Sequence, residues 1–226
     1  MSNVIHLWAI FLGTFIGLLP IINPLAAAPT FLAITEGDSD GRRREQARKG
    51  CLYMVGILVS FLIGGTFIMN FFGISIPGLR IAGGILMTGI GLGMLTTQHS
   101  AAKPDAEERE AARRKVDISF SPLAMPMLSG PGSIAVTLGF TSLATAWTDY
   151  IAIIAGIVSV ALLTYLVLRL AGKIVGFIGP VGLNAMTKIM GFLIMCIGVQ
   201  FVVNGVLGIA TDPELLHAIK SALTAR

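Results

Sequence analysis

The chain has 226 residues, of which 54% are hydrophobic and only 12% are charged, and its mean hydropathy is +0.83. An ordinary soluble domain is excluded, because such a domain carries about twice this share of charged residues. The formal net charge of +4 is interpreted as membrane topology, and nucleic-acid binding is not expected.

Six apolar stretches each approach the roughly 20 residues that an α-helix needs to cross about 30 Å of hydrocarbon. In chain order they cover 11–35, 52–72, 81–97, 119–143, 150–168 and 189–210. We therefore expect an all-α membrane protein with six transmembrane helices. Since no Lys or Arg precedes the first stretch, we expect it to be retained as a helix and not removed as a signal peptide.

Prolines interrupt the first and fourth stretches, and Pro24 and Pro131 lie 107 residues apart. Lipid cannot hydrogen-bond the backbone groups that a break releases, so unwound segments in membranes are buried in protein or line a cavity. Asn23 before Pro24, and Gly130 before Pro131, favour a new helix start, which leaves N–H groups and a positive dipole end at each break. We predict that substrate binds at these breaks, to Asn23, Pro24, Ser129, Gly130, Pro131 and Gly132.

The two halves of the chain also resemble each other. The segment 80–87 is similar to 188–195, and each half holds three stretches, so the second half is expected to be inverted relative to the first. The predicted organisation is a first three-helix repeat over 1–98 and a second over 119–210, with the first helix of each broken at Pro/Gly near the midplane. A cytoplasmic polar linker is expected over 99–118, and an outer-surface amphipathic helix over 211–226. The alternative is that apolar, glycine-rich segments resemble one another by composition alone.

Several other residues have two interpretations each. Arg80 and Lys188 begin the third helix of their repeats, where they act as interface anchors or as a gating pair. Gln200 and Asn204 share one helix face, where they hydrogen-bond between helices or line the pathway. The pairs Gly13/Gly17 and Gly89/Gly93 fit the spacing of helix-packing glycines.

Lys and Arg are unevenly distributed, with thirteen in the loops after the first, third and fifth stretches and three elsewhere. Because cytoplasmic loops are rich in these residues, both termini are expected outside the cytoplasm. No Asp or Glu lies within the six stretches, so no buried proton carrier is evident, and a coupling ion, sodium or proton, is left open. No enzyme motif of the GxSxG or HExxH type occurs, and no catalytic residue, cofactor or metal site is expected.

Blocks of sequence along nearly the whole chain resemble the MarC family of bacterial inner-membrane proteins. They are 23–25, 72–84, 122–126, 130–132, 191–193 and 198–201. The resemblance implies a six-span protein of the bacterial inner membrane that transports small neutral amino acids such as glycine and alanine, with an ion gradient as the energy source in some relatives.

The leading hypothesis is a secondary transporter that binds the zwitterion between the two half-helix starts. A lipid-carrier flippase or drug exporter on the same fold is the second hypothesis, and a membrane scaffold without transport is the third. The expected partners are the amino acid and the lipid bilayer, and the sequence makes no prediction of oligomeric state.

Overall fold

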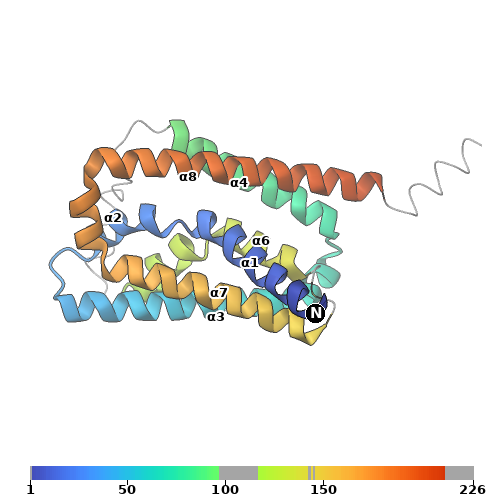
Figure 1. The fold of residues 1–226 in the computed structure, drawn as a ribbon, viewed down its shortest axis with the longest axis horizontal. Coiled ribbons are helices and arrows are strands. Elements are labelled where there is room, and N and C mark those ends of the chain that lie inside the picture. The colour runs from blue at the N-terminus through green and yellow to red at the C-terminus, as the bar shows by residue number, and fades with distance from the viewer. Residues whose placement is uncertain (1, 97–116, 142–143, 145, 212–226) are drawn as a thin grey trace, which may run out of the picture.

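The computed structural model describes residues 2–96, 117–141, 144 and 146–211, and over these residues all regular structure is helical. The elements in chain order are α1 (Ser2–Ile22), α2 (Pro24–Ile34), α3 (Asp40–Phe72), α4 (Ile76–Thr96), the π-helix η1 (Ser119–Leu128), α6 (Pro131–Thr141), α7 (Trp147–Arg169) and α8 (Ala171–Ala210) (Figure 1). The predicted linker over 99–118 and the C-terminal helix over 211–226 lie almost wholly outside the described residues.

Five of these helices are long and apolar enough to cross a membrane: α1, α3, α4, α7 and the part of α8 from Val181 to Ala210. The pair η1 and α6 forms a sixth candidate span, bent by 65°. α2 is a shorter apolar helix of 11 residues. The prediction of an all-α membrane protein is therefore confirmed, and the six predicted spans correspond to five candidate spans, or six if the bent pair counts as one.

The helices form three layers (Figure 1). The middle layer holds the two interrupted segments, α1–α2 and η1–α6. α3 and α7 pack together on one side of it, and α4 and α8 pack together on the other. The interrupted backbone is thus covered by protein on two sides, as a membrane requires of segments whose N–H and C=O groups lack helical partners.

Most spans begin earlier than the hydropathy predicts, and α1 and α3 are two examples. α1 begins at Ser2 instead of residue 11, and α3 begins at Asp40, within the basic segment that was assigned to a loop. Ser39 caps α3 by accepting a hydrogen bond from the Arg42 N–H at 3.3 Å. The 33 residues of α3 measure about 50 Å at 1.5 Å per residue, so its charged start extends beyond a hydrocarbon layer about 30 Å thick.

Glycines bring α4 and α8 into direct backbone contact. A Cβ at Gly84 would lie 2.5 Å from the Gly198 carbonyl oxygen, and one at Gly91 would lie 2.5 Å from the Gly191 carbonyl oxygen. Small residues permit this approach in membranes, where van der Waals packing drives helix association. The predicted packing pairs are mostly wrong, because a Cβ at Gly13, Gly89 or Gly93 would meet no atom within 4 Å.

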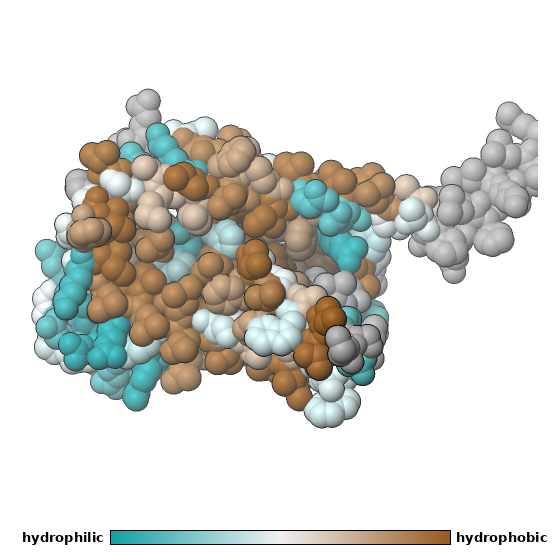
Figure 2. All heavy atoms as spheres, viewed as in Figure 1, coloured by the Kyte–Doolittle hydropathy of each residue, from teal (hydrophilic) through white to brown (hydrophobic). Residues whose placement is uncertain are grey.

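The two ends of the bundle differ in charge. One end, where α2 meets α3 and α7 meets α8, carries the basic residues from Arg42 to Lys49 together with Arg169 and Lys173; we call it the basic end. Figure 2 shows hydrophilic residues gathered there, over the start of α3. The beginning of α1 and the end of α8 both lie at the opposite end, in different layers (Figure 1).

Candidate binding site at the two helix breaks

The first break consists of one residue. Asn23 has left-handed backbone angles (φ 44°, ψ 65°) between α1 and α2. Pro24 disfavours the helical conformation in the residue before it, and Asn enters the left-handed region more readily than most residues. The Asn23 side chain then caps α2, because its Oδ1 accepts a hydrogen bond from the Ala26 N–H at 3.2 Å. Sequence and geometry thus agree on how this helix starts.

The second break is longer. Ser121 and Met125 each precede a proline and have extended backbone angles inside η1, as expected for residues before proline. The Ser129 N–H donates to the Ala124 carbonyl at 2.8 Å, and the chain then bends by 65° before α6 begins at Pro131. A Cβ at Gly130 would lie 2.9 Å from the Pro126 carbonyl oxygen, so this bend requires a glycine.

Ser133 supports the second break, and the sequence analysis gave it no role. Its buried hydroxyl lies 3.1 Å from the Gly130 carbonyl oxygen and 3.3 Å from that of Leu128. It therefore donates to the Leu128 carbonyl, which the break has released from helical bonding, and shares the Gly130 carbonyl with the Ile134 N–H. A serine in the first turn after a Gly-Pro start is the sequence signal for this role.

The two breaks adjoin in space. A Cβ at Gly132, in the first turn of α6, would lie 3.2 Å from Cγ2 of Ile21 at the end of α1. Further along, a Cβ at Gly17 would lie 3.3 Å from the ring of Phe140, so α1 and α6 lie side by side in opposite directions. Since α2 continues from α1, α2 and α6 begin at one level and run away from each other (Figure 1).

Both breaks contain a buried polar atom that has no hydrogen-bond partner. The described residues hold four such side-chain atoms, and two of them are Asn23 Nδ2 and Ser129 Oγ. Asn23 is 7% exposed and Ser129 is 0% exposed. A buried polar group without a partner costs about 1–3 kcal/mol, so these atoms require a ligand or water. The other two atoms belong to Gln46 and Ser119, towards the basic end.

Backbone donors complement these two side chains. The first N–H groups of a helix have no partner within it, and in α6 the bonding resumes with the Ile134 N–H, which donates to the Gly130 carbonyl at 3.1 Å. Gly132 and Ser133 therefore hold the open N–H groups of α6. An amide NH2, a hydroxyl and helix-start N–H groups form a set of donors that suits a carboxylate.

A cavity of about 320 Å³ lies between the middle layer and the α4–α8 pair, and none of the residues predicted to bind substrate at the breaks lines it. Figure 2 shows the surface hollowed along this boundary. The residues that line the cavity come from α1, α4, α6 and α8: Gly13, Gly17, Arg80, Val136, Gly139, Phe140, Ile197, Phe201 and Asn204. Arg80 supplies its one charge, within walls that are otherwise mostly apolar.

The remaining predicted residues separate into two groups. Asn204 lines the cavity with Arg80, and its Oδ1 accepts a hydrogen bond from Gln200 Nε2 at 2.9 Å, within one helix and not between helices. Lys188 is exposed and lies sixteen residues from Asn204 along α8, which is about 24 Å at 1.5 Å per residue. The structure therefore brings Arg80 and Asn204 together and does not bring Lys188 to them.

Asp149 is a buried carboxylate that the sequence analysis placed outside the spans. It is 2% exposed at the start of α7, where its Oδ2 accepts a hydrogen bond from the Ala146 N–H at 3.0 Å. Its Oδ1 lies 3.4 Å from Nε2 of His6 on α1. The two residues are 143 positions apart, so no sequence signal pairs them, and their contact joins the middle layer to α7 at the end opposite the basic end.

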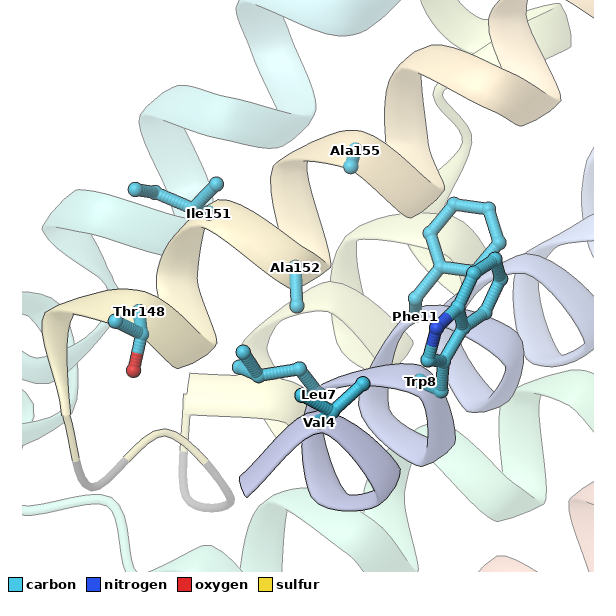
Figure 3. Close-up of a pocket in the computed structure, with 8 residues that line it drawn as sticks. All are labelled: Val4, Leu7, Trp8, Phe11, Thr148, Ile151, Ala152 and Ala155. Atoms are coloured by element: carbon cyan, nitrogen blue, oxygen red, sulfur yellow. The ribbon is translucent and has the colours of Figure 1, made fainter. Parts of the chain in front are cut away.

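Beside this pair, α1 and α7 form an apolar groove of about 340 Å³. Figure 3 shows its lining residues: Val4, Leu7, Trp8, Phe11, Thr148, Ile151, Ala152 and Ala155. The rings of Trp8 and Phe11 pack edge to face at 5.5 Å between centroids. Its apolar lining suits contact with lipid chains.

At the basic end, the segment that leads into η1 is fixed to α3. Asp117 accepts a hydrogen bond from the Ser119 N–H at 2.8 Å and lies 3.5 Å from Nζ of Lys49. Ser119, and to a smaller extent Lys49, hold the pKa of Asp117 below its ordinary value. Among the residues that the structure describes, no group of three His, Cys, Asp or Glu side chains is placed to hold a metal ion.

Comparison with known proteins gives one consistent match. The chain is similar to the MarC family of integral membrane proteins over residues 8–210. It is 37% identical over 211 residues to the inner membrane protein MarC of Salmonella paratyphi A. This match covers 89% of this chain and 95% of that protein. It is 38% identical over 212 residues, with the same coverage, to the inner membrane protein MarC of Escherichia coli O1:K1. No solved structure gives a significant match.

Proposed function

The chain belongs to the MarC family of integral membrane proteins, and we propose that it is a secondary transporter of small neutral amino acids of the glycine and alanine type. It is a multi-pass protein of the inner membrane, as the names of its relatives and its apolar helices indicate. The observation that carries the proposal is the pair of buried, unpartnered polar atoms, Asn23 Nδ2 and Ser129 Oγ, at two adjoining helix starts.

The chemistry of the breaks matches both ends of a zwitterion. The amino-acid carboxylate accepts hydrogen bonds from Asn23 Nδ2, Ser129 Oγ and the first N–H groups of α6. The ammonium group binds carbonyls at the end of α1, because Pro24 has no N–H to return to the Pro20 carbonyl. Because Ile21 lies close to Gly132, there is room for only a small substrate side chain, which favours glycine and alanine.

The inverted repeat is part of the same proposal, and the contact between α4 and α8 supports it. Gly84 meets Gly198, and Gly91 meets Gly191. Pro24 and Pro131 are 107 residues apart, and the same offset relates Gly84 to Gly191 and Gly91 to Gly198. Exchanging the two halves therefore converts each of these contacts into the other. In addition, a glycine with positive φ precedes each helix of this pair. Gly73, with φ of 64°, ends α3 before α4, and Gly179, with φ of 69°, separates the first segment of α8 from the rest of that helix.

Transport in this scheme follows from the layers. The two broken segments hold the substrate near the midplane, and the α4–α8 pair moves against the middle layer to open one side at a time. With the basic end in the cytoplasm, both termini face outwards, and the cavity that contains Arg80 is an outward-facing entrance. Arg80 attracts the carboxylate at this entrance, and Asn204 provides a polar contact beside it.

Uptake of labelled alanine and glycine into proteoliposomes tests the proposal. We expect uptake by the unaltered protein and a loss of at least about tenfold in both Asn23→Ala and Ser129→Ala, since each removes a hydrogen bond to a charged group, of about 1.5–3 kcal/mol. Asn23→Ala also removes the cap on α2. Ser159→Ala is the matched control, because Ser159 is half-buried on α7 and its hydroxyl donates to the Ala155 carbonyl within the same helix. Equal uptake by empty vesicles would remove the proposal.

The cavity gives one specific reason to retain a second function. With one arginine in mostly apolar walls and a volume of about 320 Å³, it also suits an amphiphilic anion, as a lipid-carrier flippase or a drug exporter would bind. An amphiphilic phosphate that binds with unchanged affinity to Asn23→Ala, but not to Arg80→Gln, would favour this second function over amino-acid transport.

A further inference from the structure

We propose that the basic end contains a binding site for the phosphate group of an anionic phospholipid, separate from the breaks. The site is a cavity of about 380 Å³ where the start of α3, the end of α7 and the start of α8 meet. Four cationic side chains line it, Arg43, Arg44, Arg169 and Lys173, together with one carboxylate, Asp40.

The charges in this cavity are not balanced within the described protein. Arg43 is engaged: its Nε and Nη2 donate to Thr35 Oγ1 and the Thr35 carbonyl at 3.1 and 3.2 Å, and its Nη1 lies 3.8 Å from Asp40. Arg44, Arg169 and Lys173 have no ion pair or hydrogen bond through their side chains to any described residue. Three cations from three helices around one cavity repel one another unless an anion lies between them.

The position of the cavity indicates a lipid and not a soluble anion. α3 extends beyond the hydrocarbon at this end, and Arg169 is the last residue of α7, so the cations lie at the level of lipid phosphates. Leu168 and Leu170 form the apolar part of the wall.

The adjoining part of α8 supplies a surface for acyl chains. Its first segment, before the positive φ of Gly179, runs across the end of the bundle (Figure 1). On this segment Lys173 and Phe177 lie four residues apart and so share a face, and Phe177 is 93% exposed. A cation in the cavity beside an exposed aromatic ring fits a phospholipid, whose phosphate and chains are joined.

Native mass spectrometry of the delipidated full chain with equal amounts of phosphatidylglycerol and phosphatidylcholine tests the site. We expect retention of phosphatidylglycerol to exceed that of phosphatidylcholine by about tenfold, and the preference to disappear in a double variant, Arg169→Gln with Lys173→Gln. Arg48→Gln is the matched control, because Arg48 is an exposed cation on α3 that does not line the cavity. It should retain the preference.

Two control measurements distinguish loss of the site from misfolding and from binding of a soluble anion. The charge-conserving double variant, Arg169→Lys with Lys173→Arg, should retain the lipid preference, which separates loss of charge from misfolding. Inorganic phosphate in large excess should not displace phosphatidylglycerol. The proposal is overturned if the Gln double variant keeps the preference, if Arg48→Gln loses it equally, or if soluble phosphate displaces the lipid.

Discussion

The two helix pairs that enclose the broken segments are held together by different means. In the α4–α8 pair, glycine backbones touch, and an added Cβ would lie within 2.5–2.8 Å of the partner helix at Gly84, Gly91, Gly198 and Gly205. The α3 and α7 side instead buries large side chains in the common core, among them Leu58, Leu62, Ile153 and Ile157. Interdigitated side chains prevent helices from sliding against their neighbours. A contact between glycine backbones sets the distance between two helices but has no side chains that interlock.

This difference indicates which layer moves. The cavity that contains Arg80 lies at the boundary between the middle layer and the glycine-rich pair, whereas the groove at the other boundary, between α1 and α7, is lined by apolar side chains and Thr148. We expect α3 and α7 to form the scaffold and α4 with α8 to form the mobile unit.

The largest effect is expected where α4 and α8 touch. Gly198→Leu places a side chain where a Cβ would already lie 2.6 Å from the Thr88 nitrogen and 2.7 Å from the Gly84 carbonyl oxygen. Because backbone must move, we expect destabilisation of about 3 kcal/mol or more, measured by thermal unfolding in detergent. Gly89→Leu is the control, since nothing lies within 4 Å of its position. Equal effects of the two changes would show that α4 and α8 do not meet at these glycines.

A core truncation on the scaffold side should cost slightly less. Leu58 is fully buried on α3, and Leu58→Ala leaves a cavity with an expected loss of about 2–3 kcal/mol. Ile63→Ala on the same helix is the control, because Ile63 is 67% exposed. The same unfolding assay applies. Similar losses for both variants would contradict the assignment of α3 to the fixed core.

The turn from α3 to α4 should respond more weakly. Gly73 has φ of 64° and nothing within 4 Å of its Cβ position, so Gly73→Ala introduces backbone strain of about 1–2 kcal/mol without a steric clash. Gly56 also has open space but lies inside α3, where alanine is favoured over glycine by about 1 kcal/mol. The two Gly→Ala changes should therefore shift the unfolding temperature in opposite directions, and shifts of one sign would contradict the left-handed turn.

The smallest effect on stability is expected at the second break. Ser129→Ala removes a buried hydroxyl that has no partner, so stability should stay within about 1 kcal/mol or rise slightly. Ser133→Ala should cost about 1–2 kcal/mol, because the Ser133 hydroxyl bonds to the Leu128 carbonyl, which the break releases, and to the Gly130 carbonyl. A larger loss for Ser129→Ala than for Ser133→Ala would show that Ser129 has a structural partner.

The sequence predicted features that depend on neighbouring residues. Six apolar stretches indicated the spans, and the Asn23-Pro24 and Gly130-Pro131 pairs marked the points where α2 and α6 begin. Hydropathy misplaced the start of α3, because Ser39 and the charged residues after it form a capped helix outside the hydrocarbon. Charge alone does not distinguish such a helix from a loop.

Features that depend on distant residues were missed. Gly89 and Gly93 have the spacing of a packing pair, yet the contact uses Gly84 and Gly91, because the register between α4 and α8 selects the face. The sequence shows that Asp149 is charged, but it does not show that the side chain is buried beside His6 of another helix. A lone serine such as Ser133 acquires a role only once the break supplies an unbonded carbonyl, here that of Leu128.

The central claim is that the two breaks share one ligand. A density map of the protein in lipid nanodiscs with alanine bound is the most direct measurement. The account predicts ligand density between the breaks, with the carboxylate within hydrogen-bond distance of Asn23 Nδ2 and Ser129 Oγ. Alanine bound elsewhere, or packed side chains that separate those two atoms without space for a ligand, would contradict it.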